Sequence, residues 1–245
     1  MSKVIAVTGA SAGIGRAVAE LFLARGWQVA MLARRADPLE ALARTHEGAI
    51  ALPCDVTQEA AVRQAFAEIS ERAGRIDVLF NNAGAFGPSG PIDEIALRDW
   101  QAVLDVNLTG MFLCARAAFA QMRRQDPAGG RIINNGSISA HAPRPGSVCY
   151  TATKHGVSGL TKALNLDGRD LDICAGQIDI GNAATDMTKS IGQGARQADG
   201  SVKPEAMMAA DNVAEAVWYM AGLPLEANVP TLTVMATGMP FIGRG

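Results

Sequence analysis

Short runs of apolar, often β-branched residues alternate along this chain with longer segments in which apolar residues recur at a helical period. Seven of the short runs have the length and apolar content of strands that are covered on both faces. These runs are residues 4–8, 28–33, 49–53, 76–80, 130–135, 172–178 and 231–235. Strands that alternate with helical segments are typical of βαβ units, so the pattern predicts a parallel sheet.

Six segments with the helical period lie between these runs. They are residues 13–25, 38–44, 58–73, 97–124, 150–166 and 211–220. Thr57 and Asp211 stand where two of these helices begin and are suitable N-caps. The predicted fold is a single α/β domain over residues 1–245, of the Rossmann-type doubly wound class, with a largely parallel seven-stranded sheet and helices on both faces.

Residues 181–209 interrupt this alternation, because they are rich in Gly, Gln, Ala and Met and have only weak periodicity. Long insertions inside a compact domain are usually binding loops or lids. We therefore expect residues 181–209 to form a mobile substrate loop.

Composition and charge narrow the function classes. Of the 245 residues, 49% are hydrophobic and 19% charged, as expected for a packed globular protein. The formal net charge of -2 provides no broad positive field for nucleic acid. The first residues show no charged leader before an apolar stretch, and no uninterrupted apolar run approaches the roughly 18 residues of a membrane span. We expect a cytoplasmic protein without nucleic-acid or membrane partners.

The four cysteines are far apart in the sequence and form neither a CxxC pair nor a Cys/His cluster with zinc spacing. They are Cys54, Cys114, Cys149 and Cys174. We expect reduced thiols that serve packing, and no metal site.

A glycine-rich turn follows the first predicted strand and leads into an amphipathic helix. Its glycines are Gly9, Gly13 and Gly15. Glycine lets the backbone turn tightly and approach a pyrophosphate, whose charge is met by the amides and dipole of a helix N-terminus. A tight connection without a ligand is the alternative, but the position between a first strand and a helix favours dinucleotide binding.

The spacing of this turn, TGxxxGxG, resembles that of the short-chain dehydrogenase/reductase family, and the resemblance continues over nearly the whole chain. Asp55 and Val56 resemble the family's adenine-contacting element after the third strand. Residues 81–84 match the family's NNAG motif after the fourth strand. The resemblance implies a dinucleotide site that includes Gly9, Ser11, Gly13, Ile14, Gly15, Asp55, Val56, Asn82, Ala83 and Gly84.

Tyr150 and Lys154 are four residues apart on a predicted helix, so both side chains project from one face. An ordinary tyrosine, with a pKa near 10, is poorly matched to proton transfer at neutral pH. A nearby ammonium favours the phenolate, so we expect Lys154 to lower the pKa of Tyr150 and make it a general acid or base. Alone, the pair would also fit an ordinary amphipathic helix.

The resemblance adds Ser137 and Asn107 to a catalytic tetrad with Tyr150 and Lys154. Ser137 precedes Tyr150 by thirteen residues, an interval that the family uses, and its hydroxyl would bond the substrate oxygen. Ser139 is a local competitor that the family spacing disfavours. The Asn107 amide would hold a water between Lys154 and solvent, and Lys154 would also hold the nicotinamide ribose.

Serine hydrolase chemistry is an alternative interpretation of Ser137. However, the serine stands in no GxSxG elbow, and the nearest histidine, His141, would have to act from the same loop. We therefore favour oxidoreduction and expect His141 to be a loop residue without a chemical role.

The region after the sixth strand departs from the family pattern, which usually shows Pro-Gly, a hydrophobic residue whose backbone contacts the nicotinamide carboxamide, and a threonine. Here Ala175 stands at the proline position and Ile180 at the threonine position. We expect Ile178 to keep the backbone contact. Thr185 would supply the missing hydroxyl if the residues before it bulge outward.

Arg34 and Arg35 directly follow the second strand, where an NAD site normally has a carboxylate for the ribose hydroxyls. No carboxylate occurs before Asp37. An arginine fork can instead bind the 2′-phosphate of NADP, and Ser11 would add a hydroxyl. We expect NADP to be preferred over NAD, with Arg34 as the main discriminator.

These features predict an NAD(P)H-dependent oxidoreductase that interconverts a carbonyl and a secondary alcohol of a small molecule the sequence does not identify. The alternatives are a 3-oxoacyl-thioester reductase of the acyl carrier protein type, a non-catalytic dinucleotide-sensing regulator, and a lyase, epimerase or dehydratase with tightly held cofactor. Small and apolar residues in 97–124 and 150–166 permit close helix packing between subunits, so we expect a homotetramer.

Overall fold

One parallel sheet organises residues 2–242, which the computed structural model describes. The strand order is β3-β2-β1-β4-β5-β6-β9, and every neighbouring pair is parallel. The strands are β1 Val4–Thr8, β2 Gln28–Ala33, β3 Ala49–Pro53, β4 Val78–Asn81, β5 Gly130–Asn135, β6 Ile173–Gly181 and β9 Thr231–Met235. The predicted doubly wound α/β fold is confirmed, and the order reverses between β1 and β4, where ligands bind in open α/β sheets.

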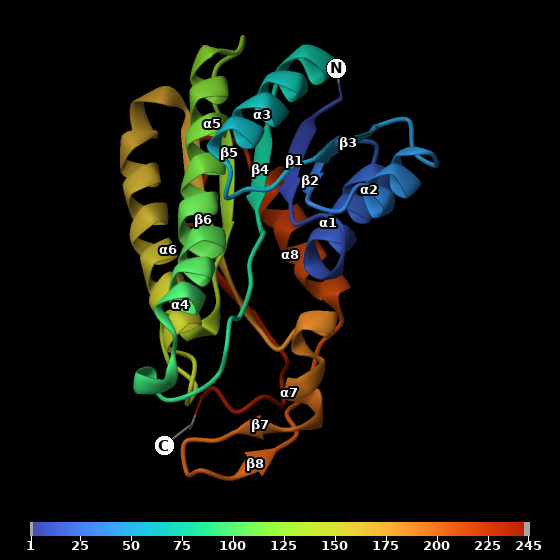
Figure 1. Cartoon of the computed structure of the whole chain (residues 1–245). Helices are drawn as coiled ribbons and strands as arrows, with labels where there is room; N and C mark the ends of the chain where they lie inside the picture. The colour runs from blue at the N-terminus through green and yellow to red at the C-terminus, as the bar shows by residue number, and fades with distance from the viewer. Residues whose placement is uncertain (1, 243–245) are drawn as a thin grey trace.

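Helices cover both faces of this sheet (Figure 1). Helices α1, α2 and α8 pack on one face against alternate strand residues such as Ile5 and Val7, and α3 and α5 pack on the other against Val4 and Ala6. Helix α6 runs beside α5 (Figure 1). Their bounds are α1 Gly13–Ala24, α2 Ala36–Ala43, α3 Glu59–Ala73, α4 Leu97–Leu104, α5 Gly110–Arg124, α6 Val148–Asp167 and α8 Ala210–Gly222. Because strand side chains alternate between faces, the all-apolar strands serve both layers.

Strand β6 ends later than predicted, at Gly181 instead of 178. All of its residues are buried, including Gln177 and Asp179. Polar side chains within a buried strand made the apolar pattern stop early, but the backbone continues to pair with β9 up to Gly181. The smaller difference at β4, which begins at Val78 instead of 76, lies at a strand start.

The helix predicted over 97–124 contains a π-helical turn at Asp105–Thr109 between α4 and α5. The amide of Gly110 donates to the carbonyl of Asp105, five residues earlier. A Cβ on Gly110 would lie 2.8 Å from Val56 Cγ2, so the helix passes Val56 closely at this point. π turns often occur at functional sites, and this one carries the fully buried Asn107.

Within Leu97–Arg124 lies an 18-residue stretch apolar enough by composition to cross a membrane, the single such case among residues 2–242. This helix packs against α3, β4 and β5, and 44% of the stretch is buried. A core helix passes the same test of composition, so the stretch is weak support for a membrane span.

The segment after β6 has more structure than its sequence pattern indicated. It contains a short turn of helix at Asp186–Thr188, α7 Lys189–Gln193 and an antiparallel pair of β7 Ala195–Arg196 with β8 Val202–Lys203. Figure 1 shows α7, β7 and β8 beyond the carboxyl ends of the central strands.

Candidate active site

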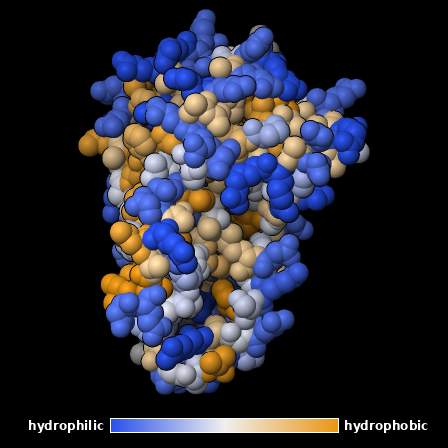
Figure 2. Space-filling view, in the orientation of Figure 1, coloured by the Kyte–Doolittle hydropathy of each residue, from blue (hydrophilic) through white to orange (hydrophobic). Residues whose placement is uncertain are grey.

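A cavity of about 980 Å³ lies at the carboxyl ends of the central strands. Its walls come from the turns after β1, β2, β3, β4 and β5, the start of α6, and the segment after β6. On the face seen in Figure 2 it is a hollow with pale and orange residues inside and hydrophilic residues around it. The cavity therefore brings together the motifs that follow β1, β2, β3, β4 and β5.

The glycine turn adopts backbone conformations that favour glycine. Gly9 has φ +69° and Gly13 has φ +54°, and a Cβ on Gly9 would lie 3.0 Å from Asn82 Nδ2 and 3.1 Å from Ala83 Cα. No side chain caps the N-terminus of α1, where Ala12 is the N-cap residue. The first amides of α1 therefore have no side-chain acceptor, as an anionic ligand at a helix N-terminus requires.

Gly9, Ser11, Gly13 and Ile14 line the cavity, whereas Gly15 is not among its lining residues. A Cβ on Gly15 would lie 2.6 Å from Asn82 Nδ2. We infer that Gly15 acts indirectly, by letting α1 approach the turn after β4.

The turn after β4 is held by Thr8, a residue that our sequence-based site omitted. The buried Thr8 hydroxyl accepts hydrogen bonds from the amides of Asn82 (2.7 Å) and Ala83 (2.9 Å). Asn82 Nδ2 donates to the Thr8 carbonyl at 2.9 Å, and Asn82 Oδ1 accepts from Asn135 Nδ2 at 2.7 Å. A polar residue at the end of a buried strand was the available signal. These bonds connect the ends of β1, β4 and β5.

The turns after β2 and β3 bring Arg34, Arg35, Asp55 and Val56 to the cavity, and both arginines are exposed. Arg35 Nη2 donates to Ser11 Oγ at 3.1 Å. Arg35, which our sequence analysis ranked second to Arg34, is thus the arginine that contacts the glycine turn. Glycine-turn amides with two guanidinium groups form a donor set that fits an anionic dinucleotide.

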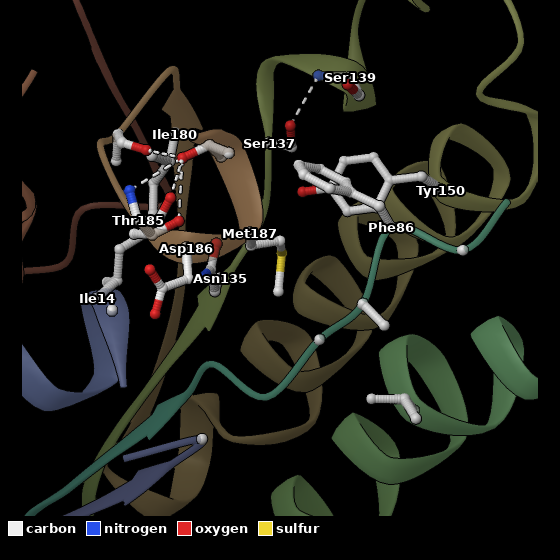
Figure 3. A pocket seen from close by; sticks show the side chains of 18 of the residues that line it. Ile14, Phe86, Asn135, Ser137, Ser139, Tyr150, Ile180, Thr185, Asp186 and Met187 are labelled. Carbon is white, nitrogen blue, oxygen red and sulfur yellow. Dashed lines mark hydrogen bonds between the residues drawn. The ribbon is translucent and has the colours of Figure 1, made fainter. Parts of the chain in front are cut away.

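Tyr150, Lys154 and Ser137 meet at the opposite part of the cavity. The buried Lys154 donates from Nζ to the Asn135 carbonyl at 2.7 Å and lies 5.4 Å from the centre of the Tyr150 ring. Figure 3 shows Ser137 facing the Tyr150 and Phe86 rings. Ser137 Oγ also accepts from the Ser139 amide at 3.1 Å. This bond fixes the position of the Ser137 oxygen.

Burial controls the acid–base properties of this pair. Burial raises the pKa of Tyr150 to about 12, an effect that a hydrogen bond from Ser137 opposes and the charge of Asp179 strengthens. Burial also lowers the pKa of Lys154 to about 8, and Asp179 opposes this change. Our expectation of a lowered tyrosine pKa was therefore wrong, because desolvation of the phenolate is the largest effect. At neutral pH Tyr150 carries its proton.

The Asn107 side chain is engaged with protein groups. Its Oδ1 accepts from the Ala85 amide at 2.7 Å, and its Nδ2 donates to the Ala85 carbonyl at 2.8 Å and to Thr153 Oγ1 at 3.1 Å. These bonds use both Nδ2 hydrogens and one acceptor position of Oδ1, and the predicted role of Asn107 as the holder of a water stays a prediction. Asn107 also fixes the loop that carries Phe86.

Ile178 does not reach the cavity. It is fully buried in the core, and its carbonyl accepts from the Gly136 amide at 2.8 Å. Because β6 continues to Gly181, Gly176 lies inside the strand. Ile180 and Gly181 stand at the end of β6, where the family pattern has its Pro-Gly pair. Ile180, Ala183 and Thr185 line the cavity in place of Ile178. The assignment of Ile178 is corrected: the family pattern had been aligned five residues too early.

Thr185 reaches the glycine turn, as one sequence-based alternative required. A Cβ on Gly13 would lie 3.1 Å from Thr185 Cγ2. Figure 3 shows Thr185 and Asp186 on the side of Ile14, and Met187 projecting toward the Tyr150 side of the pocket. The segment after β6 thus spans both halves of the cavity.

His141 lies outside the cavity lining, and its Nε2 is 2.7 Å from Asp179 Oδ2. The histidine that a serine hydrolase would need therefore bonds a carboxylate and not Ser137. Among residues 2–242, no group of three or more His, Cys, Asp or Glu side chains could hold a metal ion. The cysteines are all buried and unpaired.

Comparisons with known proteins agree with this geometry. The family model described as short chain dehydrogenase matches residues 3–196. The serine 3-dehydrogenase of Agrobacterium fabrum is 31% identical over 245 residues, which cover 99% of this chain and 97% of that protein.

Two solved structures share the fold. A short chain dehydrogenase from Burkholderia cenocepacia in complex with NADP has a TM-score of 0.81 and 30% identity, with 95% of this chain and 96% of that chain covered. A 3-ketoacyl-(acyl-carrier-protein) reductase from Brucella melitensis complexed with NADH has a TM-score of 0.84, with 96% and 97% covered. Its identity is 24%, so this second likeness indicates the fold alone.

Proposed function

The chain belongs to the short-chain dehydrogenase family and is an NAD(P)-dependent oxidoreductase for carbonyl and alcohol groups, and we propose that it reduces a small carbonyl compound with NADPH, using Tyr150 as the proton donor. The observation that carries this proposal is the meeting of Tyr150, Lys154 and Ser137 in the cavity that also contains the glycine turn. When bound, the nicotinamide dinucleotide supplies or accepts the hydride.

Each of the three side chains has a separate task in this proposal. The Tyr150 phenol, protonated at neutral pH because burial raises its pKa to about 12, donates its proton to the substrate oxygen. The Ser137 hydroxyl bonds the same oxygen as negative charge develops there. The Lys154 ammonium, fixed by the Asn135 carbonyl at 2.7 Å, favours the phenolate that remains and holds the nicotinamide ribose. Asn107 acts through the loop that it fixes.

We propose that the glycine turn holds the pyrophosphate through Gly9, Ser11, Gly13 and Ile14, and that Asp55 and Val56 contact the adenine. Asp55 Oδ1 already accepts from the Thr57 amide and hydroxyl at 3.0 and 2.9 Å, which fixes the carboxylate at the cavity wall. Asn82, Ala83 and Gly84 form the central wall.

The preference for NADPH rests on Arg34 and Arg35, which line the cavity directly after β2. Asp37, the first carboxylate after them, is exposed in the first turn of α2 and is not among the lining residues. Two guanidinium groups in a turn after β2 that holds no carboxylate before Asp37 favour a 2′-phosphate over free ribose hydroxyls, although the charge of Arg35 also acts on Asp186 across the cavity.

The walls around Tyr150 suit a small substrate. Phe86 packs on the tyrosine ring, and Met187 projects from the opposite side (Figure 3). Reduction of a 3-oxoacyl thioester of the acyl carrier protein type is the alternative. A carrier-bound substrate requires an opening for its pantetheine arm, so the two possibilities differ in the size of carbonyl compound accepted.

We further propose that the whole chain acts as one NAD(P)-binding domain with residues 181–209 as its substrate loop, and that it is a cytoplasmic homotetramer without nucleic-acid or membrane partners. Large apolar side chains on α4, α5 and α6 support the tetramer. Leu97 is 78%, Phe112 45% and Leu166 63% exposed. Exposed apolar side chains on neighbouring helices favour burial against further copies of the chain.

The test is a panel of aldehydes, ketones and acyl thioesters, with NADPH consumption as the readout. We expect turnover of small carbonyl compounds, and Tyr150→Phe should abolish it while NADPH binding stays nearly unchanged, because only the transferable proton is lost. Positioned proton transfer contributes about 100-fold or more. Residual kcat above about a tenth of wild type would assign the proton donor elsewhere. Cofactor binding without turnover of any compound would favour the regulator, and product formation without net NADPH consumption a lyase or epimerase.

A further inference from the structure

A buried carboxylate lies against the turn that carries Ser137. Asp179 of β6 is 0% exposed. Its Oδ1 accepts from the Ser137 amide at 2.9 Å and from Gln177 Nε2 at 2.6 Å, and its Oδ2 lies 2.7 Å from His141 Nε2. A Cβ on Gly136 would overlap this carboxylate, so the loop before Ser137 also fits closely around it.

The surroundings of Asp179 contain few compensating charges. From the loop after β5 it meets Ser137 and the half-exposed His141, whose Nε2 is its hydrogen-bond partner. From α6 the charge of Asp179 acts on Tyr150 and Lys154. Two uncharged residues also lie beside it: Gln177, which also donates to Ser158 on α6 at 3.0 Å, and Thr233, its register partner on β9.

A carboxyl group is costly to bury unless hydrogen bonds or charges compensate it, so packing alone does not explain this residue. Asp179 raises the pKa of Tyr150, in the same direction as burial. It also raises the pKa of Lys154, against the larger effect of burial. One carboxylate therefore favours the protonated form of both side chains.

We propose that Asp179 is a positioning residue of the active site, which orients Ser137 through its backbone amide and whose buried carboxylate favours the phenol form of Tyr150 and the ammonium form of Lys154. The inference rests on the proposed roles of Ser137, Tyr150 and Lys154. In this proposal the charge of Asp179 favours the protonated form of Tyr150, which is the form that donates a proton when a carbonyl is reduced.

The competing explanation is that Asp179 only holds the turn at Ser137. Asp179→Asn separates the two, because asparagine has the same shape and keeps an oxygen that accepts from the Ser137 amide. Its amide nitrogen can donate to His141 Nε2 in the other ring tautomer. The variant therefore removes the charge and preserves the hydrogen bonds.

The chain offers a direct readout, because it has two tyrosines, Tyr150 and Tyr219. Tyr219→Phe removes the second, which lies on α8 and is 57% exposed. In this background the ultraviolet absorption of the phenolate reports on Tyr150 alone, and Tyr150→Phe verifies that assignment. We expect Asp179→Asn to lower the titration midpoint of Tyr150 by about one pH unit, the lower end of the range for a charge at close distance.

Two matched variants control this shift. Asp167→Asn removes one exposed carboxylate at the end of α6 and should leave the midpoint unchanged. His141→Gln keeps a hydrogen-bond donor without a titratable ring, and the shift caused by Asp179→Asn should persist in that background. A shift that disappears with His141→Gln would assign the effect to the histidine and overturn the proposal.

Circular dichroism recorded with each titration shows whether the chain remains folded. If the parent protein unfolds before Tyr150 ionises, Asp179→Asn should bring the phenolate signal below the unfolding pH. A midpoint that is unchanged, that rises, or that still appears only with unfolding would contradict the role of the Asp179 charge.

Turnover supplies the second readout. In alcohol oxidation, the pH at which kcat/KM rises should move to lower pH in Asp179→Asn by the same amount as the Tyr150 midpoint. A purely structural role would lower kcat/KM at every pH without this displacement, and would also overturn the proposal. Because the phenolate titration needs no substrate, failure of the proposed reaction and failure of the Asp179 proposal remain distinguishable.

Discussion

Phe86 packs edge-on against Tyr150, with ring centroids 4.7 Å apart and an angle of 68° between the ring planes. The loop that carries Phe86 is held by Asn107, which bonds both the amide and the carbonyl of Ala85. The orientation of the Tyr150 ring therefore depends on a residue from the turn after β4 and on the π turn between α4 and α5.

Phe86→Leu should lower kcat, because it removes the aromatic contact that holds the Tyr150 ring. Such contacts contribute about 0.5–1.5 kcal/mol, which corresponds to roughly 2- to 10-fold in rate. Phe86→Tyr keeps a ring at this position and should retain most of the activity. Steady-state kinetics with one carbonyl substrate checks both variants, and equal losses in both would show that size, and not ring packing, is limiting.

The pH dependence should differ between the two directions of the reaction. Burial lowers the pKa of Lys154 to about 8, so its ammonium form is lost as pH rises through about 8. Tyr150, with its pKa raised to about 12, keeps its proton over the same interval. Carbonyl reduction should therefore be level at neutral pH and fall above about pH 8, while alcohol oxidation, which needs Tyr150 to accept a proton, should increase toward alkaline pH. Profiles of kcat/KM measured in both directions test this, and parallel profiles would be inconsistent with it.

Arg34→Ala should weaken NADPH binding by about 1.5–3 kcal/mol and barely affect NADH, because hydrogen bonds to charged groups have this magnitude. Since Arg35 Nη2 lies 3.1 Å from Ser11 Oγ, we expect Arg35→Ala to have a comparable effect. Arg63→Ala removes an exposed arginine on α3 and is the matched control. Fluorescence titration with both cofactors decides the matter: equal dissociation constants for the wild type, or tighter NADH, would refute the NADPH preference.

The segment after β6 should be mobile between two fixed ends. Arg144 donates two hydrogen bonds of 2.6 Å to the buried carboxylate of Glu205, which also accepts from Asn182 at 2.8 Å. Burial alone would raise the pKa of Glu205, but bonds from Arg144, Asn182 and Gln197 outweigh it and lower this pKa to about 2. We expect amides of residues 186–204 to exchange faster than those of the central strands, and to slow when NADPH and product are added.

Glu205→Gln should extend fast exchange to both ends of this segment and raise KM, because it leaves the Arg144 charge without its partner. Glu226→Gln, an exposed carboxylate before β9, is the control. Exchange of residues 186–204 as slow as in β1 and β4, without any ligand, would exclude a mobile loop.

Light scattering should give about four times the 25.5 kDa mass of one chain. Phe112→Glu adds a charge to the exposed apolar side of α5 and should reduce the mass. Tyr219→Asp adds a charge at a comparably exposed aromatic side chain on α8 and should not. A wild-type mass near one chain at micromolar concentration would contradict the tetramer.

Local patterns determined most of the fold. The seven strands were predictable because a parallel sheet with helices on both faces needs continuous apolar runs, and the helices because their apolar residues recur at a helical period. Glycine positions determined the phosphate turn, since Gly9 and Gly13 have positive φ. The four-residue spacing of Tyr150 and Lys154 brings them to one face of α6 whatever their surroundings.

Contacts between distant segments decided the rest. The apolar pattern ended at 178 because Asp179 is polar, yet the strand continues, since Ser137 and His141, 42 and 38 residues away, satisfy the carboxylate. Distance in sequence likewise hid the partner of Asn107, whose side chain bonds Ala85, 22 residues away. The raised pKa of Tyr150 depends on burial by the assembled site, which spacing alone does not reveal. Periodicity is a property of neighbouring residues, whereas desolvation and hydrogen-bond partners depend on which segments the completed fold brings together.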